Sequence, residues 1–403
     1  MIEAATQQES SSVQTRALRV ASSFTARPLA KTLRSYLIAA GIADAVEFVE
    51  YGHVAEYMLG PASAAENILG TVVLVRLEDS LRDQFKNGVG ADGAKLRQQL
   101  TLHVDEFVKQ VTILATRGKA VLVLPCPSNG WVAESCKLTL LYRGFTNLLV
   151  ARLRGVPGLT VLSWPKSLAG AEVSDRNTDR LGQIPFTPDA FEQLGKFLGP
   201  EIETALANRT VTAGASSSNG KADLAKFLAG LEVKVRLAPP GSEGRNHVDR
   251  ILRTAAAFSL TGENHSLSDQ DVDRMIESDG CLLISASDRL SGYGPSGVVT
   301  FHADPDALVV DALALSCPVL GKQVEYAVIS GLGQVARSRG CSKLVFKFRE
   351  SGRNQIMLKF LNTIADGTPA MAFALRVAEA EERIRKVAVA PGIWTLEFGT
   401  QSV

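Results

Sequence analysis

The stretch ALVVDALALSCPVLGKQVEYAVISGLGQVARSRGCSKLVFKF, residues 307–348, decides the fold of the C-terminal half of the chain. Apolar residues occupy 307–315 except at Asp311, and Gly321 follows five residues after Ser316. Apolar residues then recur at helical spacing before a second apolar run at 343–348. This pattern predicts a strand, a turn, a helix over about 321–338 and a further strand.

The segments around this stretch extend the same α/β pattern. A strand at 231–237 and helices at about 246–258 and 268–278 precede it, the second helix with a Ser268-x-x-Asp271 capping box. Strands are also predicted at 281–286 and 296–301, with a hairpin loop at 291–297. A helix is predicted from about residue 353, followed by two final strands, MAFALRV and IWTLEFG.

The first half alternates strands with helices from Arg16 onward. Five apolar segments predict strands at 17–23, 46–50, 71–76, 120–125 and 159–163. Helices are predicted at about 28–41, 94–117 and 188–207, the last with Thr187 as its N-cap. This alternation predicts a doubly wound parallel sheet that is covered on both faces and binds ligands at the carboxyl ends of its strands.

Composition narrows the class of protein. The 403 residues suffice for two or three domains, and the net charge of +1 argues against a large binding surface for nucleic acid or anionic membranes. No apolar run reaches the roughly 18 residues of a membrane span, and we expect no secretory signal. Five cysteines without a C-x-x-C pair argue against a disulfide scaffold, so we expect a cytoplasmic protein. His247 and His265 lack ligand-spaced partners, so no metal site is expected.

A small, polar segment, TVTAGASSSNG, divides the chain. We expect a disordered N-terminus over 1–15, an α/β domain over 16–209, a linker over 210–220 and a second domain over 221–403.

In the first domain, the stretch ASSFT places Ser23 on a small-residue turn between a strand and a helix. It resembles the first block of the SGNH (GDSL-type) hydrolases, which implies a nucleophilic role for Ser23. Asp179 matches the family's later Asp-x-x-His block, but Gly182 or Gln183 stands at the histidine position and cannot act as a general base. His53 is an alternative base; otherwise Ser23 is a hydroxyl at a helix start.

In the second domain, the order strand, two helices, three strands, helix, strand, helix resembles the GNAT acetyltransferases. In that family the turn after the fourth strand cradles the pyrophosphate of coenzyme A at a helix N-terminus. The resemblance places Leu320, Gly321 and Lys322 in this cradle. Pro318 and Gln323 depart from the family pattern, and proline lacks the N–H that such a cradle uses, so the cradle is altered. A carrier-protein phosphopantetheine, with a single phosphodiester and no adenosine, needs less of the cradle.

The same resemblance supplies candidate catalytic residues. Arg353 and Asn354 resemble family positions at the start of the later helix, where Arg353 would assist cofactor binding. Leu361 replaces the tyrosine that protonates the leaving thiolate in many GNAT enzymes. Cys317 stands near the expected thioester carbonyl, as an acyl acceptor or proton donor; the alternative is a small buried apolar residue.

From Arg16 to about Gly367, the chain resembles the FkbH-like proteins of polyketide and nonribosomal-peptide gene clusters, because its matching stretches occur in the same order. The stretches that carry this resemblance include VASSFTARPLAKTL, YGHVAEYMLGPAS, DRLGQIPFTPDAF, SDRLSGYGPSGVV and ALSCPVLGKQVE. That family has a HAD-type domain with an Asp-x-Asp-x-Thr loop between the two halves. This sequence lacks the motif and has residues 210–220 there, so we expect neither glyceryl loading nor magnesium.

Two charged groups leave alternatives open. Arg76, Glu78 and Asp79 follow the third strand, where they could bind a polar ligand or carrier arm, or form an exposed ion-pair cluster. The basic stretch 343–353 could face an acidic carrier protein, or be a solvated strand end.

The leading hypothesis is an acyltransferase that moves an acyl group to or from a thioester of a carrier-protein phosphopantetheine or of coenzyme A. Its expected partner is an acyl or peptidyl carrier protein or a synthase module, with no nucleic acid and no membrane. Two alternatives remain: a non-catalytic carrier-binding scaffold, and a thioesterase that uses Ser23.

Overall fold

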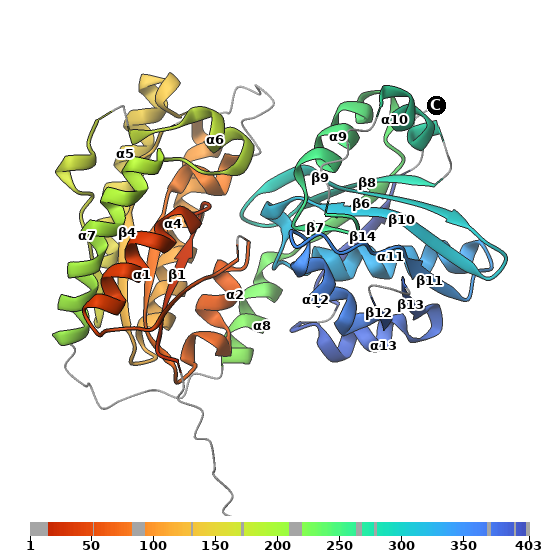
Figure 1. Cartoon of the computed structure of the whole chain (residues 1–403). Helices are drawn as coiled ribbons and strands as arrows, with labels where there is room; N and C mark the ends of the chain where they lie inside the picture. The colour runs from red at the N-terminus through yellow and green to blue at the C-terminus, as the bar shows by residue number, and fades with distance from the viewer. Residues whose placement is uncertain are drawn as a thin grey trace, which may run out of the picture.

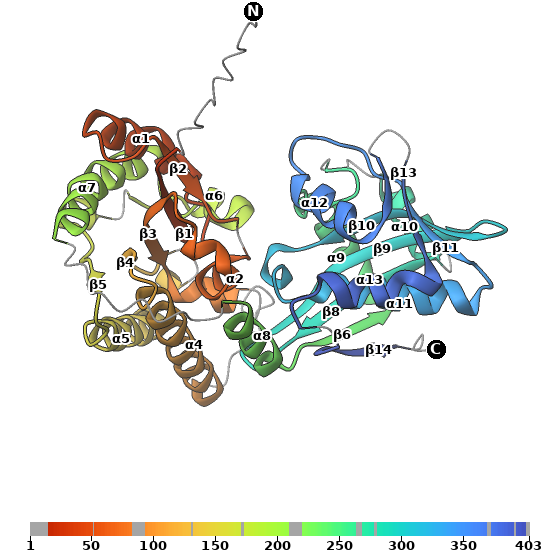
Figure 2. The ribbon, with the colours of Figure 1, turned by 90° about the horizontal axis from the view of Figure 1, so that it is seen from below.

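Two α/β lobes lie side by side, with α2 and α8 between them (Figures 1 and 2). The computed structural model describes residues 15–50, 52–82, 93–129, 132–170, 173–208, 220–262, 268–277, 280–368, 372–390 and 392–399. We refer to residues 15–208 as the N-terminal lobe and to residues 220–399 as the C-terminal lobe. Residues 1–14 of the N-terminus expected to be disordered (1–15) and residues 210–219 of the expected linker (210–220) lie outside the described residues.

The N-terminal lobe has a five-stranded sheet in which every strand pairs in parallel. The strand order is β2 (Ala45–Phe48), β1 (Ala17–Ser22), β3 (Ile68–Val75), β4 (Ala120–Pro125) and β5 (Leu159–Val161). The neighbouring inner strands β3 and β4 are apolar along nearly their whole length because helices cover both of their faces. The predicted parallel sheet is confirmed.

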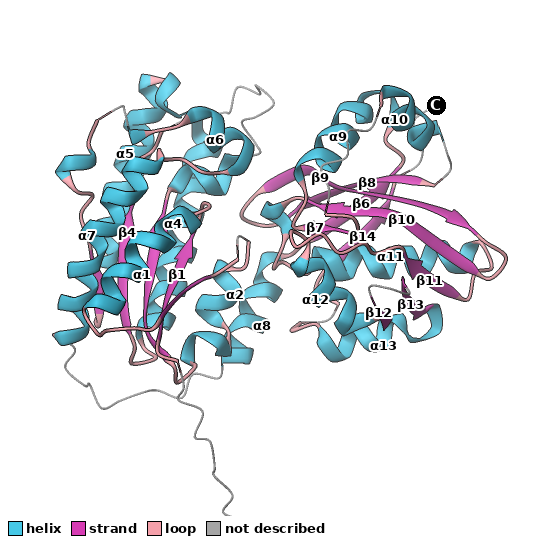
Figure 3. Ribbon diagram, in the orientation of Figure 1, coloured by secondary structure: helices cyan, strands magenta, loops and turns pink. Residues whose placement is uncertain are grey.

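Helices cover both faces of this sheet (Figure 3). Leu33 of α1 and Leu194 of α7 belong to the apolar cluster on one face, and Tyr57 of α2 and Val104 of α4 to the cluster on the other. The helices are α1 (Ala30–Ala39), α2 (Val54–Leu59), α4 (Gly93–Ala115), α5 (Cys136–Leu153), α6 (Arg176–Gly182) and α7 (Pro188–Ala207). Thr187 caps α7 as predicted, since its hydroxyl accepts from the Ala190 N–H. Short 3-10 helices are η1 (Arg27–Leu29), η2 (Pro61–Ala64), η3 (Leu77–Leu81), η4 (Val132–Glu134) and η5 (Lys166–Leu168).

The C-terminal lobe has a mixed sheet. Its order is β12 (Asp366–Thr368), β13 (Ala372–Arg376), β11 (Lys343–Phe346), β10 (Ala307–Leu315), β9 (Gly292–Ala303), β8 (Cys281–Ser287), β6 (Lys234–Ala238) and β14 (Thr395–Phe398), and β7 (Phe258–Ser259) also pairs with β10. The pairs β10–β11 and β6–β14 are parallel, and the other pairs are antiparallel. The helices are α8 (Gly220–Leu231), α9 (Gly241–Thr254), α10 (Asp269–Glu277), α11 (Val324–Ser338), α12 (Gln355–Ile364) and α13 (Val377–Val387), with the 3-10 turn η7 (Cys317–Val319).

The predicted order of strand, two helices, three strands, helix, strand and helix is present as β6, α9, α10, β8 to β10, α11, β11 and α12, with the short β7 between α9 and α10. Ser268 caps α10 as predicted, because its hydroxyl accepts from the Asp271 N–H while the Asp271 carboxylate accepts from the Ser268 N–H. Helix α13 and strand β12 were not predicted.

Two segments differ from the sequence-based prediction. The hairpin loop between β8 and β9 is present but lies earlier than the expected 291–297, because β8 ends at Ser287 and β9 already begins at Gly292. Asp288 tightens the turn by accepting from the N–H groups of Leu290 and Ser291, both at 2.8 Å. Helix α8 was not predicted, although Leu224, Leu228 and Leu231 share one face of it and are buried.

The core of the C-terminal lobe extends across the lobe boundary. Leu59 of α2 belongs to the same apolar cluster as Leu224, Leu228 and Leu231 of α8. This shared cluster holds the two lobes against each other and positions the two clefts described below.

Candidate functional site

Two glycines face each other at one contact between the lobes. Gly52 and Gly321 both have positive φ, +88° and +72°. A Cβ at position 52 would lie 2.8 Å from the Cys317 carbonyl oxygen, and a Cβ at position 321 would lie 2.7 Å from the Gly52 carbonyl oxygen. Glycine is therefore required on both sides of this contact.

This contact occupies the turn expected to cradle a pyrophosphate. Leu320 is only 1% exposed. Lys322 Nζ donates to Asp288 Oδ2 at 3.2 Å and lies over the Tyr293 ring, 5.1 Å from its centre. A pyrophosphate bound here in the expected manner would have to displace the loop that contains Gly52.

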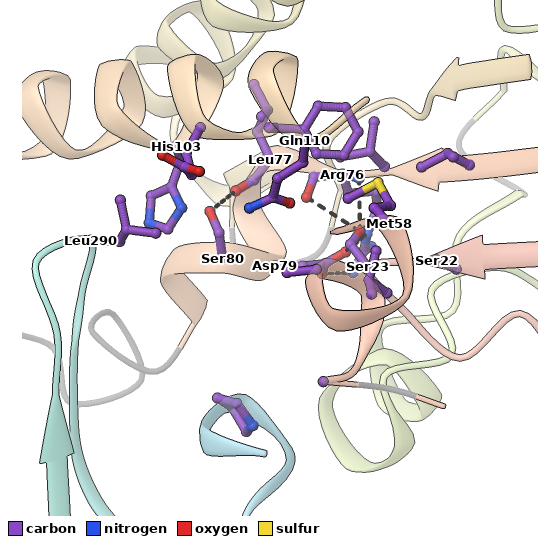
Figure 4. A pocket seen from close by; sticks show the side chains of 18 of the residues that line it. Ser22, Ser23, Met58, Arg76, Leu77, Asp79, Ser80, His103, Gln110 and Leu290 are labelled. Carbon is purple, nitrogen blue, oxygen red and sulfur yellow. Dashed lines mark hydrogen bonds and ion pairs between the residues drawn. The ribbon is translucent and has the colours of Figure 1, made fainter. Parts of the chain in front are cut away.

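A first cleft of about 220 Å³ opens on one side of this contact (Figure 4). It lies at the carboxyl ends of β1 and β3, where the fold was expected to bind ligands. Ser23, Asp79, His103 and Gln110 line it from the N-terminal lobe, and Lys322 lines it from the C-terminal lobe.

Ser23 lies in this cleft without a base that could activate it. Its hydroxyl donates to Asp79 Oδ2 at 2.7 Å and accepts from the Arg76 N–H at 2.9 Å. Burial alone would raise the pKa of Asp79, but the charges and hydrogen bonds of Arg76 and Arg82 outweigh burial and lower this pKa. A carboxylate with a lowered pKa is a poor proton acceptor, so the arrangement does not activate the serine.

Arg76 is the centre of a buried ion-pair network. Its guanidinium pairs with Asp79 and, at 2.9 Å, with Asp179, and Arg82 also pairs with both carboxylates. Arg76 is 1% exposed, so the alternative of an exposed ion-pair cluster at this position is wrong. Glu78 is buried as well; burial raises its pKa to about 7, and it accepts from the Asn129 N–H. Asp179 therefore orients two arginines rather than a histidine.

The alternative pairing of Ser23 with His53 is also wrong. His53 lines a different cleft, where its Nε2 lies 3.9 Å from Glu56 Oε2. In the described part of the chain, no histidine hydrogen-bonds to Ser23.

The second cleft, of about 690 Å³, opens on the other side of the contact between the glycines. The lining includes His53 just before α2, Glu56 of α2, Glu325 and Tyr326 of α11, and Phe360 of α12. Both lobes thus contribute side chains to one cleft at the start of α11.

Glu325 is the most unusual group in the second cleft. Its Oε2 atom is buried and has no hydrogen-bond partner among the described residues. Burial raises the pKa of Glu325 to about 7, and the charge of Glu56 adds to the shift. A carboxylate with a pKa near neutrality is suited to general base catalysis.

Tyr326 lies next to Glu325 in the sequence and also lines the cleft. Its ring packs on Phe360 with centres 5.3 Å apart. Burial, and then the carboxylates of Glu325 and Glu56, raise the pKa of Tyr326, so its hydroxyl stays protonated at neutral pH. The cleft thus contains a tyrosine donor, although Leu361 occupies the position where the family resemblance implied one.

Lysines from three helices line the same cleft. They are Lys221, Lys359 and Lys386. Lys386 pairs with Glu382 at 2.6 Å, whereas no acidic partner of Lys221 or Lys359 is found among the described residues. Exposed ammonium groups at a cleft suit a phosphate-bearing ligand.

Three candidate residues that the GNAT resemblance implied, Cys317, Arg353 and Asn354, lie outside both clefts. Asn354 is fully buried; its Nδ2 donates to the carbonyl oxygens of Ser259 (3.0 Å) and Arg349 (2.9 Å), and its Oδ1 accepts from the Ser351 N–H. Cys317 is partly exposed at the start of η7, and Arg353 is exposed on the loop before α12. Neither lines a cleft.

The expected basic rim over 343–353 is largely neutralised. Lys347 pairs with Asp311 at 2.6 Å, and Lys343 lies 3.7 Å from Asp306. This arrangement favours the alternative of a solvated strand end.

Among the described residues, no group of three or more metal-binding side chains comes together, and no helix is long and apolar enough to cross a membrane.

No protein-family model matches the chain, and no curated protein matches it. Solved structures of GNAT-family acetyltransferases align with about a third of it. A Desulfovibrio desulfuricans protein assigned to the GNAT family is 14% identical over 36% of this chain and 99% of its own, with a TM-score of 0.30. A GNAT-family acetyltransferase from Bacillus anthracis is 9% identical over 36% of this chain and 95% of its own, with a TM-score of 0.28. A Thermoplasma acidophilum N-acetyltransferase in complex with coenzyme A is 9% identical over 35% of this chain and 98% of its own, with a TM-score of 0.26.

Identities this low do not reveal a substrate or a catalytic residue. The FkbH-like resemblance and the SGNH-like character of the N-terminal lobe stay predictions.

Proposed function

We propose that the protein transfers an acyl group from a thioester to an amine or hydroxyl acceptor in the second cleft, with Glu325 as the general base. The observation that carries this proposal is the buried Oε2 atom of Glu325, which has no hydrogen-bond partner among the described residues and belongs to a carboxyl group with a pKa of about 7. The GNAT-like order of elements in the C-terminal lobe also supports acyl transfer.

The reaction needs one proton acceptor and one hydrogen-bond donor. Glu325 removes the proton of the acceptor N–H or O–H while the acceptor attacks the thioester carbonyl carbon. The carbon–sulfur bond then breaks, and the Tyr326 hydroxyl donates a hydrogen bond to the departing thiolate. The proton held by Glu325 finally passes to the thiolate, which gives a free thiol and restores the carboxylate.

The proposed donor is the phosphopantetheine thioester of an acyl or peptidyl carrier protein in polyketide or nonribosomal-peptide biosynthesis. Lys221 and Lys359 would bind its single phosphodiester. The close contact of Gly52 with Gly321 fills the turn that a coenzyme A pyrophosphate would need, which favours the shorter arm.

The test is intact-mass measurement of acyl-loaded carrier proteins and acyl-coenzyme A, incubated with the protein and a panel of amines and alcohols. Transfer should require Glu325, so Glu325→Gln should lose about 10²–10⁴-fold in rate. Glu66→Gln changes an exposed carboxylate outside both clefts and is the matched control.

Equal rates for Glu325→Gln and the wild type would overturn the assigned base. An unchanged carrier mass with stable co-elution of the carrier would instead favour the non-catalytic scaffold. The thioesterase alternative is not supported, because Ser23 contacts a carboxylate with a lowered pKa and no histidine among the described residues.

A further inference from the structure

Three polar residues of α4 face the first cleft. His103, Glu106 and Gln110 follow one another at intervals of three and four residues, which places them on one side of the helix. Figure 4 shows the side chains of His103 and Gln110 pointing from this helix into the cleft. The adjacent face of α4 carries Val104 and Val111, which pack into the lobe's own core.

Two of these side chains present polar atoms that make no hydrogen bond among the described residues. The His103 Nε2 atom is buried without a hydrogen bond among the described residues. Gln110 is 7% exposed, and within the described structure its amide makes no hydrogen bond. A buried polar atom such as His103 Nε2 costs about 1–3 kcal/mol when it stays unpaired, so a hydrogen-bond donor is expected to occupy the cleft.

The imidazole of His103 has one ring nitrogen, Nε2, that is buried without a hydrogen bond among the described residues. A neutral imidazole carries one N–H and one lone pair, and the tautomer with its proton on Nδ1 leaves the lone pair of Nε2 as an acceptor in the cleft. Burial, and then the charge of Lys322, lower the pKa of His103 to about 4, so the ring is neutral at pH 7.

The ionised groups that face the cleft are already paired. Lys322 pairs with Asp288, Glu106 lies 3.6 Å from Arg289 and 3.5 Å from Lys109, and Asp79 pairs with both arginines of its network. A charged ligand would lose its hydration without gaining an unpaired counter-charge. Much of the remaining lining is apolar: Met58, Phe107, Phe227 and Leu290.

We propose that the first cleft is a binding site for a small uncharged molecule with an apolar body and one hydroxyl or N–H group. That group donates to His103 Nε2, and its oxygen or a neighbouring acceptor takes a hydrogen bond from the Gln110 amide. An engineered cavity of about 150 Å³ accommodates benzene, so a cleft of about 220 Å³ has room for a ring with a few substituent atoms. This proposal is independent of acyl transfer in the second cleft.

The test uses phenol, toluene and benzoate as probes of one shape with different polar groups. Titration calorimetry and ligand-observed NMR should rank phenol above toluene, and benzoate last. His103→Leu should weaken phenol binding by about tenfold and leave toluene binding nearly unchanged, because it removes only the acceptor. Gln110→Leu should act in the same direction and serves if His103→Leu does not fold. His53→Leu, in the second cleft, is the matched control.

The location of the probe is checked with 4-bromophenol in crystals, where the anomalous signal of bromine should lie in the first cleft. The proposal is overturned if phenol and toluene bind equally, if His103→Leu binds phenol as the wild type does, or if bromine lies elsewhere. It is also overturned if water alone occupies the cleft at saturating probe.

Discussion

Gly52 of the N-terminal lobe and Gly321 of the C-terminal lobe approach backbone to backbone, so that neither position has room for a side chain. The loop of one lobe thereby fills the turn of the other, and the two clefts open on either side of this contact. The chemistry of each cleft depends on residues from both lobes.

Replacing either glycine should loosen the lobe interface. Gly52→Ala puts a Cβ against the Cys317 carbonyl oxygen at a positive φ, and we expect a loss of about 1–3 kcal/mol in the free energy of unfolding. Chemical denaturation measures this loss. Gly93→Ala, where a Cβ meets nothing within 4 Å, should leave stability nearly unchanged. Equal stability of both variants would contradict the close contact.

The arginine network should matter for stability and not for catalysis. Arg76→Met leaves Asp79 and Asp179 with fewer partners in a buried site, which should cost about 3–5 kcal/mol in the free energy of unfolding. Ser23→Ala should cost far less and should leave acyl transfer intact. Urea titrations check both, with the exposed Arg34→Met as control. A fall in acyl transfer by Ser23→Ala, with stability retained, would restore the serine as a candidate nucleophile.

The rate of acyl transfer should rise with pH through about 7 and then level off. Glu325 must be deprotonated to accept a proton, and its pKa is raised to about 7. A pH–rate profile of kcat measures this dependence. In Glu325→Gln the residual rate should lose the inflection near 7; an inflection that persists in this variant would assign it to another group.

The same raised pKa has a consequence for stability. The folded state binds the Glu325 proton more tightly than the unfolded chain, so this group contributes less stability as pH rises from about 4.5 to about 7. The Tm of Glu325→Gln relative to the wild type should therefore be higher at about pH 8 than at about pH 5. A relative Tm that does not change with pH would contradict the raised pKa.

Asn354 should be a structural residue. Asn354→Ala removes the donor to the Ser259 and Arg349 carbonyl oxygens, which should lower the free energy of unfolding by about 1–3 kcal/mol. Well below the Tm of the variant, kcat for acyl transfer should stay close to that of the wild type. A large loss of kcat with unchanged stability would return Asn354 to the catalytic site that the sequence resemblance implied.

The strands and most helices were predictable because their apolar spacing is local. The sequences of β3 and β4 are apolar along nearly their whole length, which predicts buried strands of a parallel sheet. Helix α8 was not predicted because its apolar residues stand between the Gly/Ser-rich stretch 210–220 and the predicted strand 231–237, with no break in the apolar pattern before that strand. Its buried face depends on Leu59, far away in the sequence.

The sequence predicted less of the candidate site than of the fold. Family positions pointed to Cys317 and Asn354, whereas the unusual electrostatics belong to Glu325 and His103. The pKa of Glu325 depends on burial against the other lobe and on Glu56, more than 250 residues earlier in the chain. An acidic residue in the first turn of a helix is common in sequences, so no local pattern distinguishes this one.

The burial of Leu59 makes each lobe depend on the other to cover its apolar surface. Because this residue of the N-terminal lobe is buried in the apolar cluster of the C-terminal lobe, cutting the chain between them would expose leucines on both new surfaces. Either lobe expressed alone would therefore expose an aggregation-prone apolar face. The smallest unit that can be produced and studied in solution is the chain with both lobes.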